Sequence, residues 1–449
     1  MQSFELDKTD LSKLRKAIEG DDALLASTLA EYHASEIAIL FDNLNSEDRQ
    51  RIINLLEVEK ASEVIAEMSE EAHPEELLIQ LHPEKRTEIV EELDYDDATD
   101  IISQLDEDEQ QEILEDLSAD DAQSIRNLLS YHEETAGGLM NTQMITVNFN
   151  FTKKDAIDEI IRQSEEIEEF YTVFVVDNAG VFKGIVSLKD IIKAKGNVKI
   201  TEMVKPDAVY VKTDTDQEEV AKLLSQYNLT SIPVVNDDLV LLGRVTFDDV
   251  IDVLEDENTE DILKISGVSE DEELAGNWVD AVKSRLPWLI INLGTAFLAS
   301  AVVRYYEDTL AHLAILSAYM TIIAGMGGNA ATQALAVTVR RISLFDLTDR
   351  QAYRTVLKEF TVGMINGAVT GLIVLIFAYF FDANLMLGLV IFMAMTGNLI
   401  IAGITGAGIP LLLKRIGIDP AIASSIIITT FTDVFGFLLL LGLASKLLL

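Results

Sequence analysis

The sequence has no cysteine, and this absence removes several classes of chemistry at once. Disulfide bonds, thiolate metal sites and cysteine nucleophiles are all excluded. Histidine is also scarce, with five residues in 449, and His312 is the only one beyond Arg285. We find no Ser-His-Asp arrangement, phosphate-binding loop or metal–histidine cluster, so the protein is not expected to be an enzyme.

Basic side chains are few and unevenly distributed. The chain carries 34 Lys and Arg residues against 76 Asp and Glu residues, a net charge of −42. Residues 285–449 hold only eight of the acids, so nearly all of the negative charge lies in the first 284 residues. Such acidity argues against nucleic-acid binding, which needs a basic surface, and favours cations. Because residues 1–10 are polar and carry no signal peptide, the first half is expected in the cytoplasm.

Five apolar stretches follow Arg285, each near or above the about 20 residues needed to cross a bilayer. They are Leu286–Val303, Thr309–Val339, Phe360–Phe381, Ala383–Leu413 and Ala421–Ala444. A soluble core could contain one such helix but not five in succession, so we expect a transmembrane domain of five helices. The loops after the second and fourth stretches are basic, which predicts a cytoplasmic N-terminal half and a C-terminus outside.

Polar residues inside these stretches are the candidates for an ion path. Asp433 is an isolated carboxylate in the fifth stretch, where it is expected to face water, although it could instead pair with another helix. Ser425 and Thr429 precede it at intervals of four residues, so the three share one helix face. The other candidates are Asn329, Thr332 and Asn398. The hydroxyl residues could equally serve helix packing. Oxygen ligands suit a hard cation such as magnesium, which we expect to be held through its water shell.

Residues 1–135 contain a repeat. Leu44, Leu56, Met68, Leu81, Leu93, Leu105, Leu117 and Leu129 recur every 12 residues, with a single interval of 13. Each repeat is expected to form a turn followed by two or three helical turns. Stacked repeats of this kind form an α-helical superhelical domain, and most of its acidic residues are expected to lie on the solvated surface.

A second repeat lies within residues 137–262. Residues 174–177 and 184–190 recur 59 positions later as 233–236 and 243–249. Each copy predicts two β-strands and a helix, and the pattern resembles tandem CBS domains, which are β-α-β-β-α regulatory modules. Ser187, Asp190, Thr246 and Asp249 match the ribose motif of that family, which implies a site for an adenine nucleotide such as ATP. The Ser and Thr hydroxyls could equally cap the helices that follow.

The order of these parts resembles the MgtE family of magnesium channels over essentially the whole chain. The marks of the resemblance are residues 136–140, 213–220, 327–329, 417–421 and 432–433. It implies a multidomain protein with five parts: a repeat domain at 1–135, CBS domains at 136–200 and 201–262, a connecting helix at 263–284 and a five-helix transmembrane domain at 285–449.

The resemblance also implies how such a protein works. The family forms homodimers in the lipid bilayer, here expected in the inner membrane, with hydrated Mg²⁺ in the pore at the position of Asp433. The connecting helix acts as a plug, and Mg²⁺ bound between the cytoplasmic domains closes the channel. The sensor positions implied are Asp216, Glu218, Asp249, Asp252, Glu257, Glu260 and Asp261, to which we add Glu59, Asp96 and Asp100 from the repeat domain.

Some alternatives stay open at this point. Ser425, Thr429 and Thr332 stand where Asn, Ala and Asn are expected in the family, so selectivity among magnesium, cobalt, nickel and manganese is not fixed by the sequence. An ion-coupled secondary transporter of divalent cations, regulated by CBS domains, fits the same pattern. A carrier of a different solute, such as an anion, is disfavoured because the Asp433 carboxylate would repel it.

Overall fold

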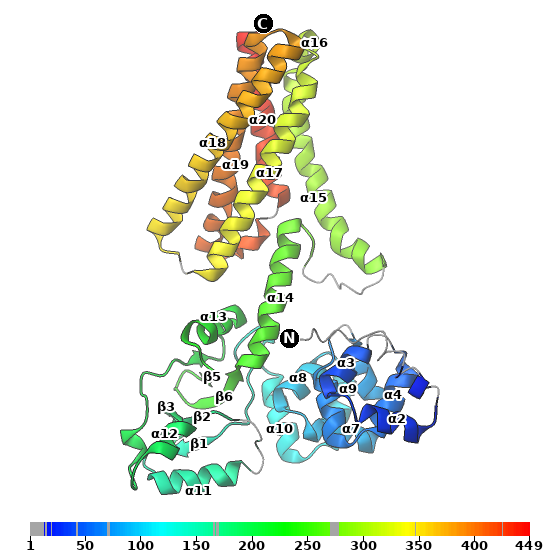
Figure 1. The fold of residues 1–449 in the computed structure, drawn as a ribbon, viewed down its shortest axis with the longest axis vertical. Coiled ribbons are helices and arrows are strands. Elements are labelled where there is room, and N and C mark those ends of the chain that lie inside the picture. The colour runs from blue at the N-terminus through cyan, green and yellow to red at the C-terminus, as the bar shows by residue number, and fades with distance from the viewer. Residues whose placement is uncertain are drawn as a thin grey trace. The chain divides into compact units, whose positions relative to one another are not determined.

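The computed structural model describes residues 13, 16–18, 20–41, 44–69, 72–164, 167, 170–269, 278–345, 347–423 and 425–449. The chain divides into two compact units, Met1–Glu255 and Asp256–Leu449, and the elements of each are labelled in Figure 1. The boundary falls inside one helix, and each unit is described by itself below.

The first unit begins with a series of short helices. They are α2 (Asp22–Leu29), α3 (Ala34–Phe41), α4 (Ser46–Leu55), α5 (Val58–Ala66), α6 (Pro74–Gln80), α7 (Pro83–Glu92), α8 (Tyr95–Ser103), α9 (Glu107–Asp116) and α10 (Ala119–Leu128). Each packs against the helix two places along the chain, as in a helical solenoid, which confirms the predicted repeat. Four of the repeating leucines, Leu56, Leu81, Leu93 and Leu117, are C-cap residues and are at most 9% exposed. At these four positions, the 12-residue spacing therefore marks the buried end of a helix.

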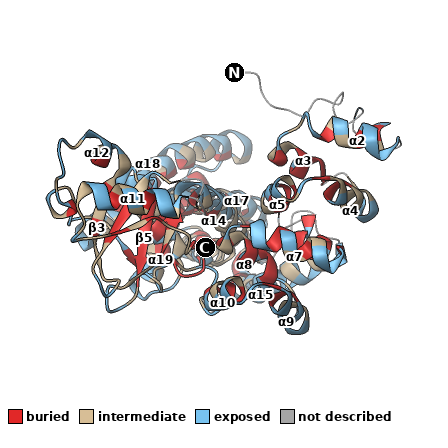
Figure 2. Cartoon of the chain, turned by 90° about the horizontal axis from the view of Figure 1, so that it is seen from below, coloured by how far each residue is buried: buried red, intermediate tan, exposed pale blue. Residues whose placement is uncertain are grey.

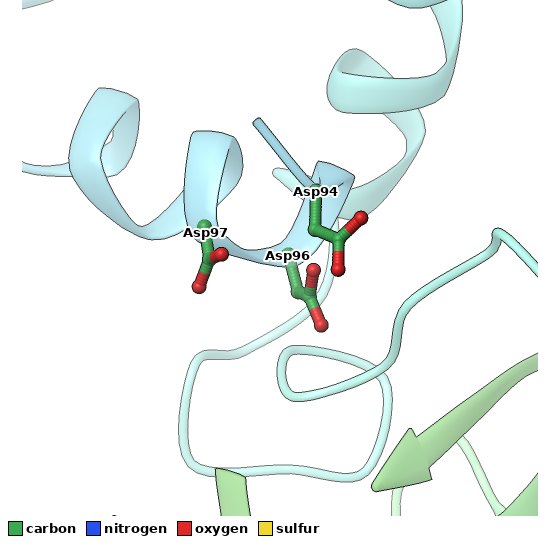
Figure 3. Close-up of side chains that lie close together, drawn as sticks. All are labelled: Asp94, Asp96 and Asp97. Carbon is green, nitrogen blue, oxygen red and sulfur yellow. The ribbon is translucent and has the colours of Figure 1, made fainter. Parts of the chain in front are cut away.

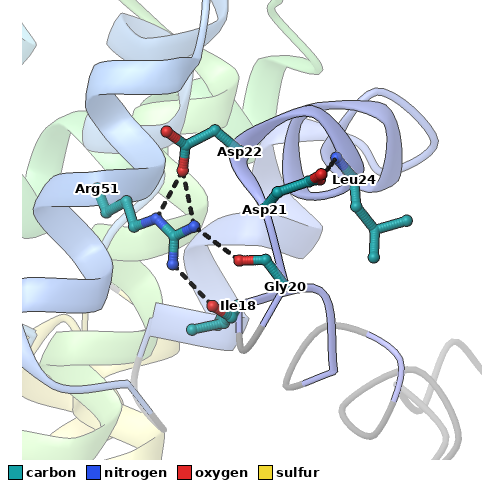
Figure 4. A network of polar contacts seen from close by, with 6 residues as sticks. All are labelled: Ile18, Gly20, Asp21, Asp22, Leu24 and Arg51. Atoms are coloured by element: carbon teal, nitrogen blue, oxygen red, sulfur yellow. Dashed lines mark hydrogen bonds and ion pairs between the residues drawn. The ribbon is translucent and has the colours of Figure 1, made fainter.

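Arg51 of α4 fixes the path of the chain into this solenoid (Figure 4). Its guanidinium donates to the carbonyl oxygens of Ile18 and Gly20 at 2.7 and 3.1 Å. It also forms an ion pair with Asp22, in the first turn of α2, at 2.7 Å. Backbone carbonyls that accept no hydrogen bond within a regular helix need other donors. Arg51 therefore supplies donors to two such carbonyls and also pairs with a carboxylate.

Two copies of a β-α-β-β-α module follow in the same unit. The first comprises β1 (Thr146–Asn148), α11 (Lys153–Gln163), β2 (Thr172–Val176), β3 (Phe182–Ser187) and α12 (Leu188–Lys193). After a short 3-10 helix, η2 (Ile200–Glu202), the second comprises β4 (Val211–Lys212), α13 (Gln217–Tyr227), β5 (Ser231–Val235), β6 (Leu241–Thr246) and α14 (Phe247–Ser266). Each sheet has three strands, with one parallel and one antiparallel pairing, and every residue of β5 is buried (Figure 2). The predicted tandem CBS fold is confirmed.

The glycines of the second sequence repeat have a common structural cause. Gly184 of β3 lies opposite Val175, and Gly243 of β6 lies opposite Val234, at matching positions of the two sheets. A Cβ atom at Gly184 would lie 2.3 Å from the carbonyl oxygen of Lys205, and Gly184 has a φ of +136°. A second backbone segment therefore passes too close to this strand for any side chain.

Among the described residues, five helices are long and apolar enough to cross a membrane, and all lie in the second unit: α15 (Trp278–Tyr305), α17 (Leu316–Leu344), α18 (Asp349–Asp382), α19 (Leu385–Arg415) and α20 (Ser425–Leu447). Two short elements connect them, α16 (Glu307–His312) and the 3-10 helix η3 (Pro420–Ile422). The prediction of five spans is confirmed, but the predicted start of the second span at Thr309 is wrong. Thr309 belongs to α16, and the chain leaves helical geometry at Leu313, with φ −129° and ψ +61°, before α17 begins.

Helix α19 lies at the centre of this bundle and packs against α17, α18 and α20. On α18, Gly363, Gly367 and Gly371 recur every four residues and face α19. A Cβ atom at Gly363 would lie 2.3 Å from the carbonyl oxygen of Leu399, and one at Gly367 would lie 2.8 Å from the Cα of Thr396. These glycines therefore permit close helix packing, which is the usual function of small residues in membrane helices.

The predicted connecting helix at 263–284 differs from the observed helices. Helix α14 already starts at Phe247, inside the second CBS copy, and continues to Ser266. It ends at Gly267, whose φ of +76° suits a helix terminus. Residues 270–277 lie outside the described residues, and residues 278–284 belong to α15. The helix that leaves the CBS pair is therefore α14, displaced toward the N-terminus from its predicted position.

Candidate metal sites

Three carboxylates gather at the start of α8 (Figure 3). Asp94 is the N-cap residue, and Asp96 and Asp97 lie in the first turn. Each offers a carboxylate oxygen, and these three oxygens lie within 4.8 Å of one another. Asp96 is 9% exposed, and its Oδ1 has no hydrogen-bond partner among the described residues. Although a helix N-terminus favours negative charge, three neighbouring carboxylates repel one another, and a bound cation or protons would reduce this repulsion.

A second group of carboxylates, on α14, extends this cluster. The end of the repeat domain packs on the second CBS copy, because Leu128 of α10 shares a buried apolar cluster with Val250 and Val253 of α14. Asp249 lies in the first turn of α14, where its carboxylate accepts hydrogen bonds from the Thr246 hydroxyl at 2.5 Å and the Thr246 N–H at 3.1 Å. The packing that buries these valines therefore also brings the acids of α8 and α14 together.

The pKa values of the cluster reflect this crowding. Burial, followed by the charge of Asp249, raises the pKa of Asp96 well above its usual value. Burial, followed by the charges of Asp94 and Asp249, raises the pKa of Asp97 to about 7. Burial also raises the pKa of Asp252, with a further contribution from Glu67. Oxygen ligands in such a set suit a hard divalent cation, which would relieve the repulsion between them.

These pKa values predict how the protein responds to pH when divalent ions are removed. Unfolded Asp titrates near pH ~4, whereas folded Asp97 titrates near pH 7. The associated stability is fully present below the unfolded pKa and is lost as pH rises through the folded pKa. As the pH is raised from roughly 5 to 8, the melting temperature of the full-length protein in detergent with EDTA should therefore fall. Adding Mg²⁺ at pH 8 should restore most of the loss; a melting temperature that is flat or rises with pH would contradict the cluster.

The cluster contains some of the predicted sensor residues and several that the prediction missed. Asp96, Asp249 and Asp252 belong to it, and the charge of Asp100 adds to the pKa shift of Asp96. The missed members are Asp94, Asp97, Asp248 and Glu67. The signal for two of them was present in the sequence, because Asp94 and Asp97 flank Asp96 in one acidic run.

The other predicted sensor residues of the first unit lie in different surroundings. Glu59 is exposed on α5. Asp216 is the N-cap residue of α13, where its carboxylate accepts a hydrogen bond from the N–H of Glu218 at 2.9 Å. Both Asp216 and Glu218 are exposed. Their geometry is that of a helix cap, and their role as metal ligands remains a prediction.

Glu257, Glu260 and Asp261 lie on the part of α14 that belongs to the second unit. Lys264, also on α14, forms ion pairs with Glu260 and with Asp419, the latter at 3.0 Å. The Asp261 carboxylate accepts a hydrogen bond from Ser343 of α17 at 3.3 Å, and burial followed by the charge of Asp419 raises its pKa. The end of α14 is thus held against α17 and the α19–α20 connection. Lys264 lies between the carboxylates of Glu260 and Asp419.

We expect Lys264→Gln to loosen the last turn of α14, because it removes the ion pair with Asp419. A partly buried ion pair of about 1 kcal/mol corresponds to about a fivefold change in a local opening equilibrium. Hydrogen exchange of the amides between Leu263 and Val268 should accelerate by about that factor. Lys446→Gln, at an exposed lysine of α20, is the matched control. Equal protection in both variants would show that the ion pair does not hold α14.

Asp433 lies on α20, half-buried, and its Oδ1 has no hydrogen-bond partner among the described residues. One turn earlier, the Thr429 hydroxyl donates to the carbonyl oxygen of Ser425 at 2.5 Å. A Cβ atom at Gly328 of α17 would lie 3.3 Å from the Thr429 side chain, so the two helices are in close contact here. The next residue after this glycine is Asn329, which is exposed in the second unit.

Two of the remaining pore candidates differ in exposure. Thr332, on the following turn of α17, is partly buried. Asn398 of α19 is 0% exposed and lies inside the helix bundle, where its Nδ2 donates to the carbonyl oxygen of Ile323 at 3.0 Å. Thr332 therefore lies near the Asn329 surface, whereas Asn398 is enclosed by neighbouring helices.

The predicted nucleotide residues occupy equivalent positions in the two CBS copies. Ser187 precedes α12 and Thr246 precedes α14, while Asp190 and Asp249 lie in the first turns of these helices. In the second copy, Thr246 and Asp249 bond to each other, and Asp249 also belongs to the acidic cluster. In the first copy, Ser187 makes no side-chain cap bond.

Comparison with known proteins agrees with this organisation. Three family profiles match the chain: "Divalent cation transporter" at 320–443, "MgtE intracellular N domain" at 32–134, and "CBS domain" at 136–197 and 200–256. The magnesium transporter MgtE of Thermus thermophilus is 34% identical over 96% of each chain. That of Bacillus subtilis is 30% identical over 93% of each chain, and that of Enterococcus faecalis is 37% identical over 71% of this chain and 70% of its own.

Two solved structures match the first part of the chain. The cytosolic domain of the Mg²⁺ channel MgtE in complex with ATP is 36% identical, with a TM-score of 0.52, and the match covers 54% of this chain and 99% of that one. The soluble part of a magnesium transporter is 27% identical, with a TM-score of 0.51, and the match covers 56% and 98%. With its repeat domain, CBS pair and five membrane helices, this chain belongs to the MgtE family of magnesium transporters, a family of ion transporters rather than enzymes.

Proposed function

We propose that this protein conducts Mg²⁺ into the cell across the inner membrane and is closed by Mg²⁺ bound to its cytosolic domains. The observation that carries the proposal is the cluster of Asp96, Asp97 and Asp249, whose pKa values are raised by burial and by the charges of neighbouring carboxylates. Two relatives whose alignments cover 93–96% of both chains are named magnesium transporters, which supports Mg²⁺ as the transported ion. A channel is preferred to an ion-coupled transporter because one matched solved structure is named a Mg²⁺ channel.

The proposed pore site is the α20 face that carries Ser425, Thr429 and Asp433. It is supported by the Asp433 oxygen, which lacks a hydrogen-bond partner among the described residues although it lies within a membrane helix. Asn329 and Thr332 of α17 complete the site on the neighbouring helix. Hydrated Mg²⁺ would be held by carboxylate, amide and hydroxyl oxygens through its waters, since Mg²⁺ gives up its waters reluctantly. In a two-fold homodimer, the Asp433 carboxylates of the two subunits would share this ion.

The proposed gate works through the charge of the acidic cluster. At low cytosolic Mg²⁺ the ionised carboxylates of α8 and α14 repel one another, which favours separation of the repeat domain from the second CBS copy. Bound Mg²⁺ removes this repulsion and favours the compact, closed state. Each ion can shift the equilibrium only by its differential affinity for the two states, so several carboxylates must act together.

Helix α14 is the proposed connection between the cluster and the pore. The same continuous helix carries Asp249 and Asp252 near its start and Lys264 near its end. Lys264 pairs with Asp419, a few residues before α20, which carries Asp433. A change in the position of the first turn of α14 can therefore be transmitted to the connection that precedes the pore helix.

We propose that the repeat and CBS domains lie in the cytoplasm and the C-terminus outside. The basic loops after the second and fourth spans support this orientation, as does the match to a domain described as intracellular. The CBS pair is the proposed site for ATP at Ser187, Asp190 and Thr246. The ATP complex of the matched cytosolic domain supports it, and ATP would act as a regulator rather than a substrate.

Uptake into vesicles tests this function directly. Full-length protein in liposomes containing a Mg²⁺-sensitive dye should admit Mg²⁺ down its gradient, and single-channel currents should be measurable. Uptake that strictly requires a counter-flow of protons or sodium would instead identify the ion-coupled transporter. The absence of Mg²⁺ flux under every gradient would contradict both functions.

A further inference from the structure

The amide of Asn398 lies at the contact of three membrane helices. Asn398 belongs to α19 and is 0% exposed, and its Nδ2 donates to the backbone carbonyl of Ile323, on α17, at 3.0 Å. Its Oδ1 has no hydrogen-bond partner among the described residues. A buried amide is costly unless its polar atoms are paired, and a leucine would fill similar space without that cost. The amide therefore needs an explanation beyond filling the core.

Two glycines surround this amide on different helices. A Cβ atom at Gly327 of α17 would lie 2.2 Å from the Asn398 Nδ2, and one at Gly436 of α20 would lie 2.8 Å from the same atom. Both distances are shorter than van der Waals contact, so neither position accepts a side chain while the amide is in place. The backbones of α17 and α20 consequently rest directly on the Asn398 side chain, which acts as a spacer between them.

The spacer lies at the depth of the proposed pore site. Gly327 is followed by Gly328, whose Cα faces Thr429, and Gly436 follows Asp433 by about one helical turn. The same two helices carry Asn329 and Asp433. Any change in the size or hydrogen bonding of the Asn398 amide must therefore move these oxygen-bearing side chains relative to each other.

We propose that Asn398 is a positioning residue, not an ion ligand, and that it sets the spacing of α17 and α20 that decides which hydrated cation passes Asp433. The inference rests on the proposed function of Asp433. The Nδ2 donor of Asn398 has the essential role, because it binds the backbone of α17. The bulk of the amide keeps the two glycines apart. A hydrated ion is recognised by the width of its water shell, so a small change in spacing alters discrimination between Mg²⁺ and the larger Ca²⁺.

Asn398→Asp separates the two roles of this residue. As a ligand, aspartate would bind a divalent cation more strongly than asparagine. As a spacer, it loses the donor to Ile323 and places its oxygens against a carbonyl oxygen. We expect Mg²⁺ flux in liposomes to fall by about tenfold and the ratio of Mg²⁺ to Ca²⁺ flux to change severalfold. Unchanged flux and ratio, or a lower half-saturating Mg²⁺ concentration, would overturn the proposal.

Matched variants keep the test interpretable. Thr405→Val removes a polar group of α19 at nearly constant volume. Among the described residues the Thr405 hydroxyl bonds only within α19, so the variant should leave flux and ratio unchanged. If Asn398→Asp does not assemble, Asn398→Ser replaces it: its side chain is too short to replace the donor to Ile323, so flux should fall and the ratio should change. Wild-type values would again overturn the proposal. Asp433→Asn in the same assay tests the pore itself. If Asp433→Asn behaves as wild type, the proposed pore fails, whereas a defect in Asp433→Asn with none in Asn398→Asp refutes the spacer alone.

Discussion

Asp433→Ala should remove most of the Mg²⁺ flux while leaving the protein folded. The carboxylate is half-buried in a membrane helix, and its Oδ1 has no hydrogen-bond partner among the described residues. Removing this oxygen therefore breaks no hydrogen bond among those residues. The substitution does remove the full negative charge that attracts the ion. Each loss of about 1.4 kcal/mol in binding free energy lowers the affinity tenfold. We expect a decrease in flux of about a hundredfold at low external Mg²⁺, measured with a dye inside liposomes.

A charge-matched control separates a site effect from a general effect of charge. Asp382→Asn removes one negative charge at the end of α18, where the carboxylate accepts a hydrogen bond from Tyr319 at 2.5 Å. The amide oxygen of Asn can still accept this bond, so the variant should transport Mg²⁺ at close to the wild-type rate. Flux retained in Asp433→Ala would contradict the pore, and flux lost equally in both variants would attribute the effect to charge alone.

The double variant Asp96→Asn/Asp249→Asn should leave Mg²⁺ flux active at Mg²⁺ concentrations that close the wild type. Burial and the charge of Asp249 both raise the pKa of Asp96 and so favour its protonated form. Their neutralisation removes both the repulsion and the charge that attracts the ion. In EDTA the variant should therefore melt at a higher temperature than the wild type, yet gain much less stability from added Mg²⁺.

The variant Asp108→Asn/Glu115→Gln provides the control for this prediction. Both residues are exposed on α9 of the same repeat domain, and the substitution removes the same number of charges. It should retain closure by Mg²⁺ and most of the Mg²⁺-dependent stabilisation. If the Asp96→Asn/Asp249→Asn variant closes at the same Mg²⁺ concentration as this control, the cluster is not the sensor. Asp249→Asn/Asp252→Asn should behave like Asp96→Asn/Asp249→Asn, since Asp252 lies on α14 with Asp249 and belongs to the same cluster.

The architecture was predictable because it depends on patterns that are local in the sequence. Five apolar stretches and a β-α-β-β-α repeat determine their own elements, and both were confirmed. The start of the second span was wrong because the chain around Leu313 is apolar on both sides of the break, so hydropathy does not reveal it. The end of α14 was misplaced for a similar reason, since acidic residues continue on both sides of Gly267.

The site was less predictable because its members meet only in the folded chain. Asp96 and Asp249 are separated by more than a hundred residues, and their proximity depends on the packing of α10 on α14. Asp97 was missed because an acid in a charged run is usually solvated, and nothing local distinguishes its raised pKa. Asn398 was assigned to the pore by residue type, whereas its complete burial follows from two glycines on other helices.

The side on which Mg²⁺ acts tests the central claim most directly. In an excised membrane patch containing the full-length protein, the current can be recorded while Mg²⁺ is raised on one face at a time. Raising Mg²⁺ on the face that carries the repeat and CBS domains should reduce the open probability, and raising it on the other face should only increase the inward current. An open probability that does not respond to Mg²⁺ on the domain face, or that falls only from the opposite face, would contradict closure through the acidic cluster.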